Sequence, residues 1–208
     1  MELERYLKPT QLCDFDKWVV RKKVEEIISK AKTEREKAER ILDFCQNEIL
    51  FAYGNWNEKA SEVLEKGRGM CSGKNNLAVA MLRAAQIPAR YKRGVLVGES
   101  KMWKFASEKD SFLAEIFSTL PRRRDHIVCE VLLNGEWEIR DVTTDRGLKE
   151  GMKVFGIPLE SDLVEIETLE DFDRWAEERQ KRIEIKQDRE GILRKINHFV
   201  ELIRRRYG

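Results

Sequence analysis

Apolar residues recur at helical spacing over much of the first half of the chain. The spacing predicts a helix from Asp14 to about Lys32 and a second helix after Thr33. Thr33 and Glu36 stand three residues apart, which is the spacing of a capping box at a helix start. A broader apolar stripe over Ser72–Gln86 predicts a buried helix that stops before Pro88, since proline cannot continue a helix.

Alternation of apolar and polar positions in the middle of the chain predicts three strands. The first covers Ala89–Val97, and the other two cover His126–Leu133 and Glu136–Val142. Asn134-Gly135 separates the last two, and this dipeptide between alternating strands is the strongest short hairpin signal. We therefore expect an antiparallel hairpin at this point.

The length of the turn sets the register of this hairpin. If two residues form the turn, Leu133 pairs with Glu136, and continuing the pairing places His126 opposite Thr143. His126 and Asp141 then lie on one face as diagonal neighbours, about 7 Å apart at the backbone. An imidazole and a carboxylate can reach each other over that separation, so the register predicts a His–Asp pair.

The rest of the chain is predicted to be helical or irregular. We expect an irregular stretch over Phe51–Asn57, a short helix near Ala60–Glu65, and an amphipathic insertion over Ser100–Leu120. Residues Leu169–Arg206 indicate two helices that divide near Gly191. Helices on both sides of a central hairpin indicate the α+β fold class.

Size and charge narrow the class of protein. A chain of 208 residues can bury one substantial core, and we expect a core domain with N-terminal helices at 1–160 and a docked C-terminal helical extension at 161–208. Lysine and arginine total 40 against 38 aspartates and glutamates, so the net charge of +2 argues against a nucleic-acid partner. The arginine runs at 122–124 and 204–206 fit solvated charge or recognition of an acidic substrate group better.

The sequence also bears on location and bound groups. The start of the chain lacks the basic flank and apolar stretch of a secretion signal, and no apolar run approaches the length of a membrane span. We therefore expect a cytoplasmic protein without a membrane partner, and its oligomeric state stays open. The four cysteines Cys13, Cys45, Cys71 and Cys129 lie far apart, which argues against a zinc or dithiol site, so no metal and no cofactor are expected.

Cys71 is the thiol whose setting suggests chemistry. It follows two glycines and begins the predicted buried helix, where unpaired amides and the helix dipole favour a thiolate. His126 can exchange a proton with the thiol and with a departing nitrogen, while Asp141 holds the ring in orientation. Taken singly, these residues also fit core packing, a satisfied strand histidine and a turn cap, and as a zinc site they lack a fourth ligand. In chain order they predict a Cys–His–Asp triad.

An acyl-transfer site also needs hydrogen-bond donors for the negative charge that develops on the attacked carbonyl oxygen. The backbone amide of Cys71, at a helix start, is the first donor that we expect. Trp56, Asn55 and Gln46 are candidates for a second donor from the preceding segment. The sequence does not choose among these three.

Three blocks of sequence resemble the transglutaminase-like superfamily of papain-fold cysteine enzymes. Gly69-Met70-Cys71, followed by Leu82–Arg90, is similar to that family's nucleophile helix and its exit into the next strand. Asp125-His126, and then Gly135–Thr143 with Trp137 and Asp141 inside it, resemble the family's His and Asp strands. The similarity covers roughly residues 40–145.

The resemblance implies a compact, single-domain member of the prokaryotic or archaeal type, in which a nucleophile helix packs on an antiparallel sheet. It implies that Cys71, His126 and Asp141 are catalytic and that acyl transfer proceeds through a thioester. Gln86 departs from the family pattern, since a glycine is usual at that position.

The function that follows is hydrolysis or transfer at an amide or peptide bond, with a peptide or protein amide as the substrate. The alternative is a catalytically silent module that binds a peptide or a partner protein in the same groove. Such a module would use the aromatic residues of the insertion, which are Trp103, Phe105, Phe112 and Phe117.

Overall fold

The computed structural model describes residues 3–97, 100–118, 123–158, 163–183 and 189–205. The helices are η1 (Glu4–Leu7, 3-10), α1 (Trp18–Ile28), α2 (Glu34–Asn47), α3 (Ala60–Lys66), α4 (Cys71–Ala84), α5 (Lys101–Lys109), α6 (Ser111–Ser118), α7 (Arg146–Val154), α8 (Phe172–Ile183) and α9 (Arg189–Arg205). The strands are β1 (Leu50–Phe51), β2 (Arg68–Gly69), β3 (Ala89–Leu96), β4 (Arg124–Leu133), β5 (Glu136–Arg140) and β6 (Leu163–Leu169). Leu120, Arg122, Arg206 and the expected boundary at residue 160 lie outside the described residues.

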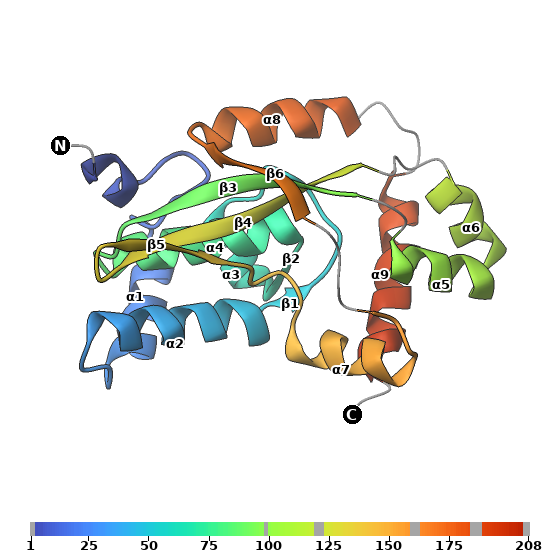
Figure 1. The fold of residues 1–208 in the computed structure, drawn as a ribbon, viewed down its shortest axis with the longest axis horizontal. Coiled ribbons are helices and arrows are strands. Elements are labelled where there is room, and N and C mark those ends of the chain that lie inside the picture. The colour runs from blue at the N-terminus through green and yellow to red at the C-terminus, as the bar shows by residue number, and fades with distance from the viewer. Residues whose placement is uncertain (1–2, 98–99, 119–122, 159–162, 184–188, 206–208) are drawn as a thin grey trace.

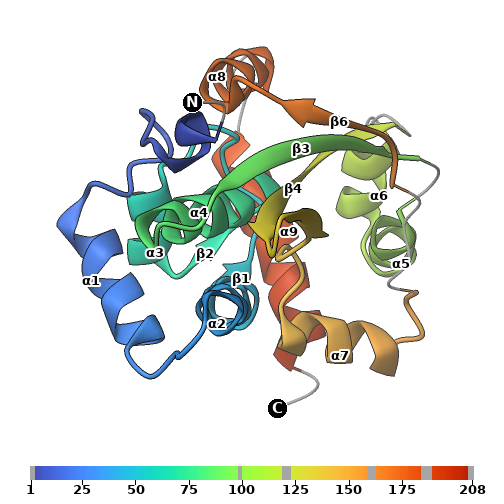
Figure 2. The same ribbon diagram turned by 60° about the vertical axis from the view of Figure 1, so that its left-hand side comes forward.

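An antiparallel sheet in the order β5-β4-β3-β6 forms the centre of the molecule. Figures 1 and 2 show α1 to α4 gathered toward one end of the sheet, α5, α6, α7 and α9 toward the other, and α8 beyond β6. The short strands β1 and β2 form a separate parallel pair that ties the residues after α2 to the residues before α4. The α+β class, with helices from both ends of the chain around an antiparallel sheet, is confirmed.

Helix α4 is the buried centre of this arrangement. Each residue from Cys71 to Arg83 is buried, and the apolar side chains of the helix share the main core with Ile127 and Val131 of β4. A helix that is covered on every side also buries its polar residues. Lys74, Asn75 and Asn76 are all fully buried, at 0% exposure.

The predicted register of the hairpin is confirmed where the two strands pair, from Leu133–Glu136 to Cys129–Arg140, and the predicted pairing of His126 with Thr143 lies beyond that ladder. Leu133 lies opposite Glu136 in the β4–β5 ladder. Asn134 and Gly135 have φ values of 54° and 85°, as a two-residue turn with the twist of a hairpin requires. β5 ends at Arg140, earlier than the predicted strand end.

Two helix starts show how the sequence signals act. Helix α1 begins at Trp18 rather than near Asp14, because the Asp14 carboxylate accepts hydrogen bonds from the backbone N–H and the hydroxyl of Ser61, at 2.9 and 2.6 Å. Asp14 therefore caps α3, although it is distant from that helix in sequence, and it is not the first residue of α1. Thr33 caps α2 as predicted, since its hydroxyl oxygen accepts from the Glu36 N–H at 3.1 Å.

The exit from α4 explains an unusual residue. Gln86 has a φ of +63°, and the N–H groups of Gln86 and Ile87 donate to the carbonyls of Arg83 and Leu82 at 3.0 and 2.9 Å. This is a Schellman motif, whose left-handed position is normally occupied by glycine. The family's usual glycine at this position and the backbone observed here agree.

The pattern of apolar and polar residues did not predict β6 (Leu163–Leu169). β6 pairs with β3, although its central residues 165–167 are exposed and it shows no clean alternation. Leu163 packs where a side chain at Gly94 would stand, since a Cβ built there would lie 2.5 Å from it. The two helices predicted for Leu169–Arg206 are present as α8 and α9, and α9 begins at Arg189, two residues before Gly191. The elements β1, β2 and α7 were also not predicted.

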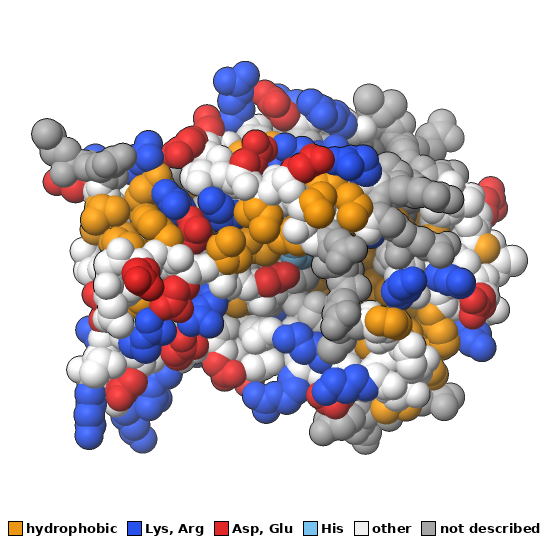
Figure 3. Space-filling model, in the orientation of Figure 1, with side chains coloured by type: hydrophobic (Ala, Val, Ile, Leu, Met, Phe, Trp, Pro, Cys, Tyr) orange, Lys and Arg blue, Asp and Glu red, His pale blue; other side chains and the backbone are white. Residues whose placement is uncertain are grey.

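The surface carries both signs of charge. Figure 3 shows basic and acidic side chains interspersed over one face, with hydrophobic side chains gathered over the sheet. Ile139 of β5 and Ile166 of β6 are among the exposed apolar residues, at 47% and 42% exposure. Within the described ranges, no helix combines the length and the apolar character needed to cross a bilayer.

Candidate active site

Cys71 is the first residue of α4, and it differs from the other cysteines in its exposure. Met70 precedes the helix without a side-chain cap, so the amides of the first turn remain available. Cys71 is 7% exposed, whereas Cys13, Cys45 and Cys129 are at 0%. Burial raises the pKa of each of these three thiols, which stay protonated in the core. Among the cysteines, Cys71 is the one that solvent reaches.

His126 and Asp141 form a close pair. His126 lies on β4, and its Nε2 stands 2.7 Å from Oδ2 of Asp141, which follows the end of β5. The histidine side chain is 10% exposed and the aspartate side chain 45%. The other carboxylate oxygen of Asp141 accepts from the Thr143 N–H at 2.9 Å. An ionised carboxylate only accepts, so Nε2 carries the proton and Nδ1 is left for a second partner.

Cys71 also interacts with the ring. Burial lowers the pKa of His126, but its hydrogen bonds with Asp141 and Cys71 outweigh this and raise the pKa to about 10. Burial in turn raises the pKa of Asp141, and the hydrogen bond from His126 overcomes it and lowers the pKa to about 2. Asp141 is nearly half exposed, so water screens part of this interaction. The structure thus brings the three predicted residues together, in the order thiol, imidazole, carboxylate.

Trp56 lies beside the thiol. It packs with Met70 and Cys71 in a small apolar cluster, and the ring of Trp175 from α8 meets it edge to face, with centroids 5.3 Å apart. The Trp56 backbone N–H donates to Gln180 Oε1 at 3.0 Å. Its indole nitrogen makes no hydrogen bond with any residue that the structure describes.

The side-chain hydrogen bonds of the other two candidates are made to residues other than Cys71. The side-chain oxygen of Asn55 accepts hydrogen bonds from Arg189 and Gln180. The Gln46 amide nitrogen donates to the Thr144 carbonyl at 3.4 Å. Of the three candidates from the sequence, Trp56 is the one that the structure places against Cys71.

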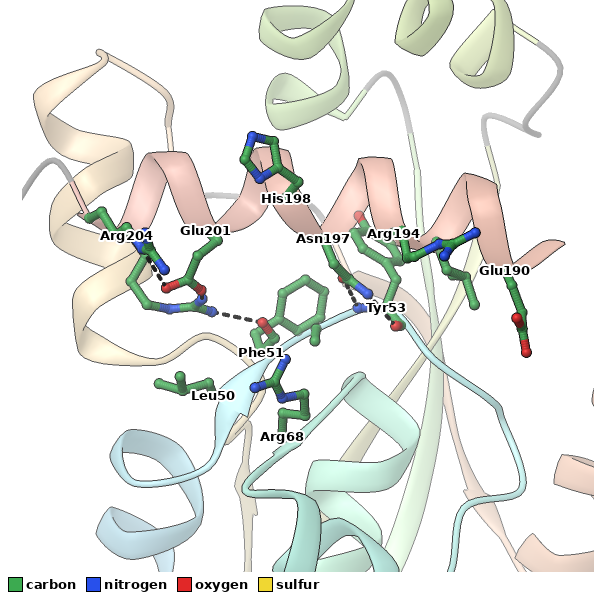
Figure 4. A pocket seen from close by; sticks show the side chains of 13 residues that line it. Leu50, Phe51, Tyr53, Arg68, Glu190, Arg194, Asn197, His198, Glu201 and Arg204 are labelled. Atoms are coloured by element: carbon green, nitrogen blue, oxygen red, sulfur yellow. Dashed lines mark hydrogen bonds and ion pairs between the residues drawn. The ribbon is translucent and has the colours of Figure 1, made fainter. Parts of the chain in front are cut away.

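Side chains from the C-terminal part of the chain hold the segment that leads to Trp56. Asn197 of α9 accepts from the Tyr53 N–H at 2.7 Å and donates to the Tyr53 carbonyl at 2.9 Å (Figure 4). Arg204 donates to the Phe51 carbonyl at 2.7 Å, while Asp145 accepts from the Phe51 N–H at 2.9 Å. One signal for this is present in the sequence, since an irregular segment must find partners for its backbone groups. It did not reveal where those partners lie.

A cavity of about 600 Å³ is lined by residues of α9 and by residues 50–53 (Figure 4). Phe51 lines this cavity and also packs against the cluster of Trp56, Met70 and Cys71. Arg68, Arg194, Arg204 and Arg205 line it together with Glu190 and Glu201, so its wall is more basic than acidic. The cavity therefore adjoins the thiol cluster through one aromatic side chain.

Lys74 is a buried charge that the sequence analysis did not single out. It lies one turn after Cys71, and its Nζ donates to the Gln46 carbonyl at 2.9 Å. Burial lowers its pKa to about 8, although the nearby carboxylate of Asp145 acts in the opposite direction. No group of three or more His, Cys, Asp and Glu side chains in the described segments is arranged to hold a metal ion.

The family model of the transglutaminase-like superfamily matches residues 21–142. A solved structure from Cytophaga hutchinsonii, named a "Putative Cysteine Protease", superposes with a TM-score of 0.53 at 19% identity, covering 81% of this chain and 55% of that one. A "Putative Protease" from Parabacteroides distasonis ATCC 8503 gives a TM-score of 0.42 at 16% identity, covering 64% of this chain and 26% of that one. No curated protein matches the sequence.

The solved structure with the higher score shares the fold, and the chain spans about half of its length. The family match is of a different kind, because it rests on the sequence itself and includes α4 and the β4–β5 hairpin. It extends over more than half of the 208 residues and contains Cys71, His126 and Asp141. This chain belongs to the transglutaminase-like superfamily.

Proposed function

We propose that this protein is a cysteine-dependent amide or peptide hydrolase or acyltransferase that works through a thioester. Cys71 is the nucleophile, His126 is the acid and base, and Asp141 orients the imidazole. The substrate is an amide of a peptide or protein. The observation that carries the proposal is the 2.7 Å contact between His126 and Asp141, together with the interaction of Cys71 with the same ring.

The proposed reaction starts from a charged pair. Because the pKa of His126 is raised to about 10, its ring is protonated at neutral pH and favours the thiolate of Cys71. The sulfur attacks the amide carbonyl, and a C–S bond forms as the C=O π bond opens to an oxyanion. The backbone amide of Cys71 and the indole N–H of Trp56 are the proposed donors to that oxygen.

The tetrahedral intermediate then collapses. The C–N bond breaks, the Nδ1 proton of His126 passes to the departing nitrogen, and ammonia or an amine leaves behind a thioester. Water or a second amine attacks the thioester carbonyl while His126, now neutral, takes a proton from it. The Cys71 sulfur then leaves as a thiolate while His126 keeps the proton it took, which restores the starting charged pair. Hydrolysis and transfer differ only in which nucleophile reaches the thioester.

The test is alkylation of Cys71 by iodoacetamide across a pH series, in the wild type and in His126→Ala. We expect the wild type to react at neutral and mildly acidic pH, and the variant to lose most of that reactivity there. The other three cysteines are fully buried, so a single modified site is expected in the native protein. Cys71→Ser is the control that identifies the modified residue.

The proposal fails if Cys71 follows the pH dependence of a free cysteine both with and without His126. The binding-module alternative would then gain support if Cys71→Ala kept a bound peptide. Of the aromatics assigned to that role, Phe117 is buried and the other three are partly buried. Trp103 stacks on Phe117 at 5.1 Å, and Phe105 contacts Phe155 and Phe199, so these rings pack on one another. No observation favours the alternative over the enzyme.

A further inference from the structure

Asn75 is a buried amide that reaches three different segments of the site. It lies on α4, one turn after Cys71, and has 0% exposure. Its Nδ2 donates to the Cys71 carbonyl at 2.9 Å, to the Ile127 carbonyl at 2.9 Å and to the hydroxyl oxygen of Thr143 at 3.1 Å. One amino group therefore links the helix of the thiol to β4 and to the loop after β5.

The side-chain oxygen of Asn75 also accepts two hydrogen bonds. Asn75 Oδ1 accepts from the Cys129 N–H at 3.1 Å and from the Val142 N–H at 3.5 Å. A primary amide has two N–H donors and two lone pairs, so five contacts exhaust its capacity and one donor must be shared. An apolar side chain at this position would leave buried backbone groups of β4 and of the following loop without partners.

The contacts of Asn75 fall next to the proposed catalytic residues. Ile127 follows His126 in β4, and Val142 and Thr143 follow Asp141. Asparagine is a poorer helix former than alanine or leucine, and an interior helical position gives it no capping role. The hydrogen bonds that Asn75 makes to β4 and to the loop after β5 explain why an asparagine stands inside this buried helix.

A chain of hydrogen bonds runs from Asn75 to the imidazole. The hydroxyl oxygen of Thr143 accepts from Asn75, and Thr143 hydrogen-bonds to Asp141 through its side chain and through its N–H, the latter at 2.9 Å. Asp141 then accepts from His126 Nε2 at 2.7 Å, and His126 meets Cys71. Since Cys71 and Asn75 share one turn of α4, the chain closes on itself.

We propose that Asn75 is the positioning residue of this site, which fixes the helix of Cys71 against β4 and, through Thr143, aims the carboxylate of Asp141 at His126. The inference rests on the proposed function, because positioning matters only if the three side chains act together. It assigns no contact with substrate to Asn75.

The chain offers a matched control in the next residue. Asn76 is also at 0% exposure, donates to the carbonyls of Leu12 and Glu58 at 2.9 and 3.1 Å, and accepts from the Tyr91 hydroxyl at 2.8 Å. None of these partners adjoins the proposed triad. Asn75→Ala and Asn76→Ala therefore remove comparable buried hydrogen bonds from one helix, and only the first disturbs the site.

Two readouts separate positioning from stability. The first is the titration of the His126 ring by NMR, with His198→Gln used to assign the second histidine, and the second is the pH profile of Cys71 alkylation by iodoacetamide. For Asn75→Ala we expect the His126 titration to move down by about one pH unit and alkylation at pH 7 to fall on the order of tenfold. For Asn76→Ala we expect both to stay within about twofold of the wild type, although both variants lose stability.

If Asn75→Ala does not fold, a second pair of variants with smaller changes tests the same proposal. Thr143→Val keeps the shape of the side chain and removes the hydroxyl between Asn75 and Asp141. Thr144→Val makes the same change one residue later, where the contact in the structure is to the backbone carbonyl. We expect the His126 titration and the alkylation profile to shift in the first variant and not in the second.

Equal shifts in the members of either pair, or no shift in both, would overturn the inference. Failure of the proposed function has a different signature, because it appears as alkylation that does not respond to His126→Ala. The ring titration reports on the His126–Asp141 geometry whether or not the thiol turns over a substrate. The two failures can therefore be told apart in one set of samples.

Discussion

Asp141 accepts a hydrogen bond from His126 although it lies one residue beyond the end of β5. The carboxylate belongs to the loop and the imidazole to the strand, so their meeting depends on how the loop leaves the sheet. The Thr143 N–H, bonded to the other carboxylate oxygen, fixes that exit. The pKa of each partner is consequently moved by the other, upward for His126 and downward for Asp141.

The first prediction concerns Asp141→Asn. We expect the pKa of His126 to fall from about 10, because burial, which lowers it, is then opposed by fewer interactions. NMR titration of the imidazole measures this directly. A His126 titration that is the same in wild type and variant would contradict the assigned pair.

The same pair gives stability a defined pH dependence. The His126 contribution is complete below its ordinary pKa of 6.5 and is lost as the pH rises through about 10. The Asp141 contribution is complete above its ordinary 3.8 and is lost as the pH falls through about 2. The stability advantage of the wild type over Asp141→Asn should therefore be largest between about pH 4 and 6.5. Urea unfolding at several pH values measures it.

The second prediction separates the proposed oxyanion donor from the nucleophile. Trp56→Phe keeps an aromatic ring beside Cys71 and removes the indole N–H. Acylation of the thiol by p-nitrophenyl acetate should slow on the order of a hundredfold, because the donor acts on a developing oxyanion. Alkylation by iodoacetamide forms no oxyanion and should change by less than about twofold.

Trp18→Phe is the control for that experiment, since Trp18 lies on α1 and is 71% exposed. It should leave both rates unchanged. Equal slowing of acylation and alkylation in Trp56→Phe would mean that the indole only packs against the thiol.

The third prediction concerns the attachment of α9. Arg204 donates to Asp145 at 3.0 and 3.1 Å, and the two side chains are 11% and 1% exposed. Arg204→Met strands a buried carboxylate, so we expect a loss of about 3–5 kcal/mol in the free energy of unfolding. Arg205→Met removes a contact of a side chain that is 77% exposed and should cost less than about 1 kcal/mol. Urea denaturation of both variants measures these losses. Similar losses in the two variants would contradict the prediction.

The fourth prediction uses the left-handed residue after α4. Gln86→Gly should raise the stability by up to about 1 kcal/mol, since glycine tolerates the φ of +63° without the steric strain of a side chain. Ala85→Gly, at a φ of −80°, should lower it instead. Thermal unfolding of both variants distinguishes the outcomes, and a destabilised Gln86→Gly would contradict the strain argument.

The parts of the fold that follow from local rules were predictable from the sequence. The Asn134-Gly135 turn sets the register of the hairpin within a few residues, and this register directs the chain after β5 back toward His126. The start of α4 at Cys71 follows from two glycines and an apolar stripe. In each case the deciding residues are close together along the chain.

The parts that depend on distant partners were not predictable. β6 has exposed charges in its middle, and a positive φ at Glu165 breaks its regularity, so only its pairing with β3 makes it a strand. Tyr53 and Asn197 are 144 residues apart. Asn75 did leave a trace, because three consecutive polar residues interrupt the apolar stripe of α4, and such a group in a buried helix calls for partners elsewhere.

The dependence of residues 51–56 on α8, α9 and Asp145 has a consequence for where this protein can be cut. The family match ends at Val142, whereas β6 and the side chains that hold Phe51, Tyr53 and Trp56 all come later. Truncation after Val142 would remove β6 and expose the edge of β3. It would also remove the hydrogen-bond partners of residues 51–56, which lie next to the thiol. We therefore expect the shortest part of this protein that folds on its own to extend beyond the residues of the family match.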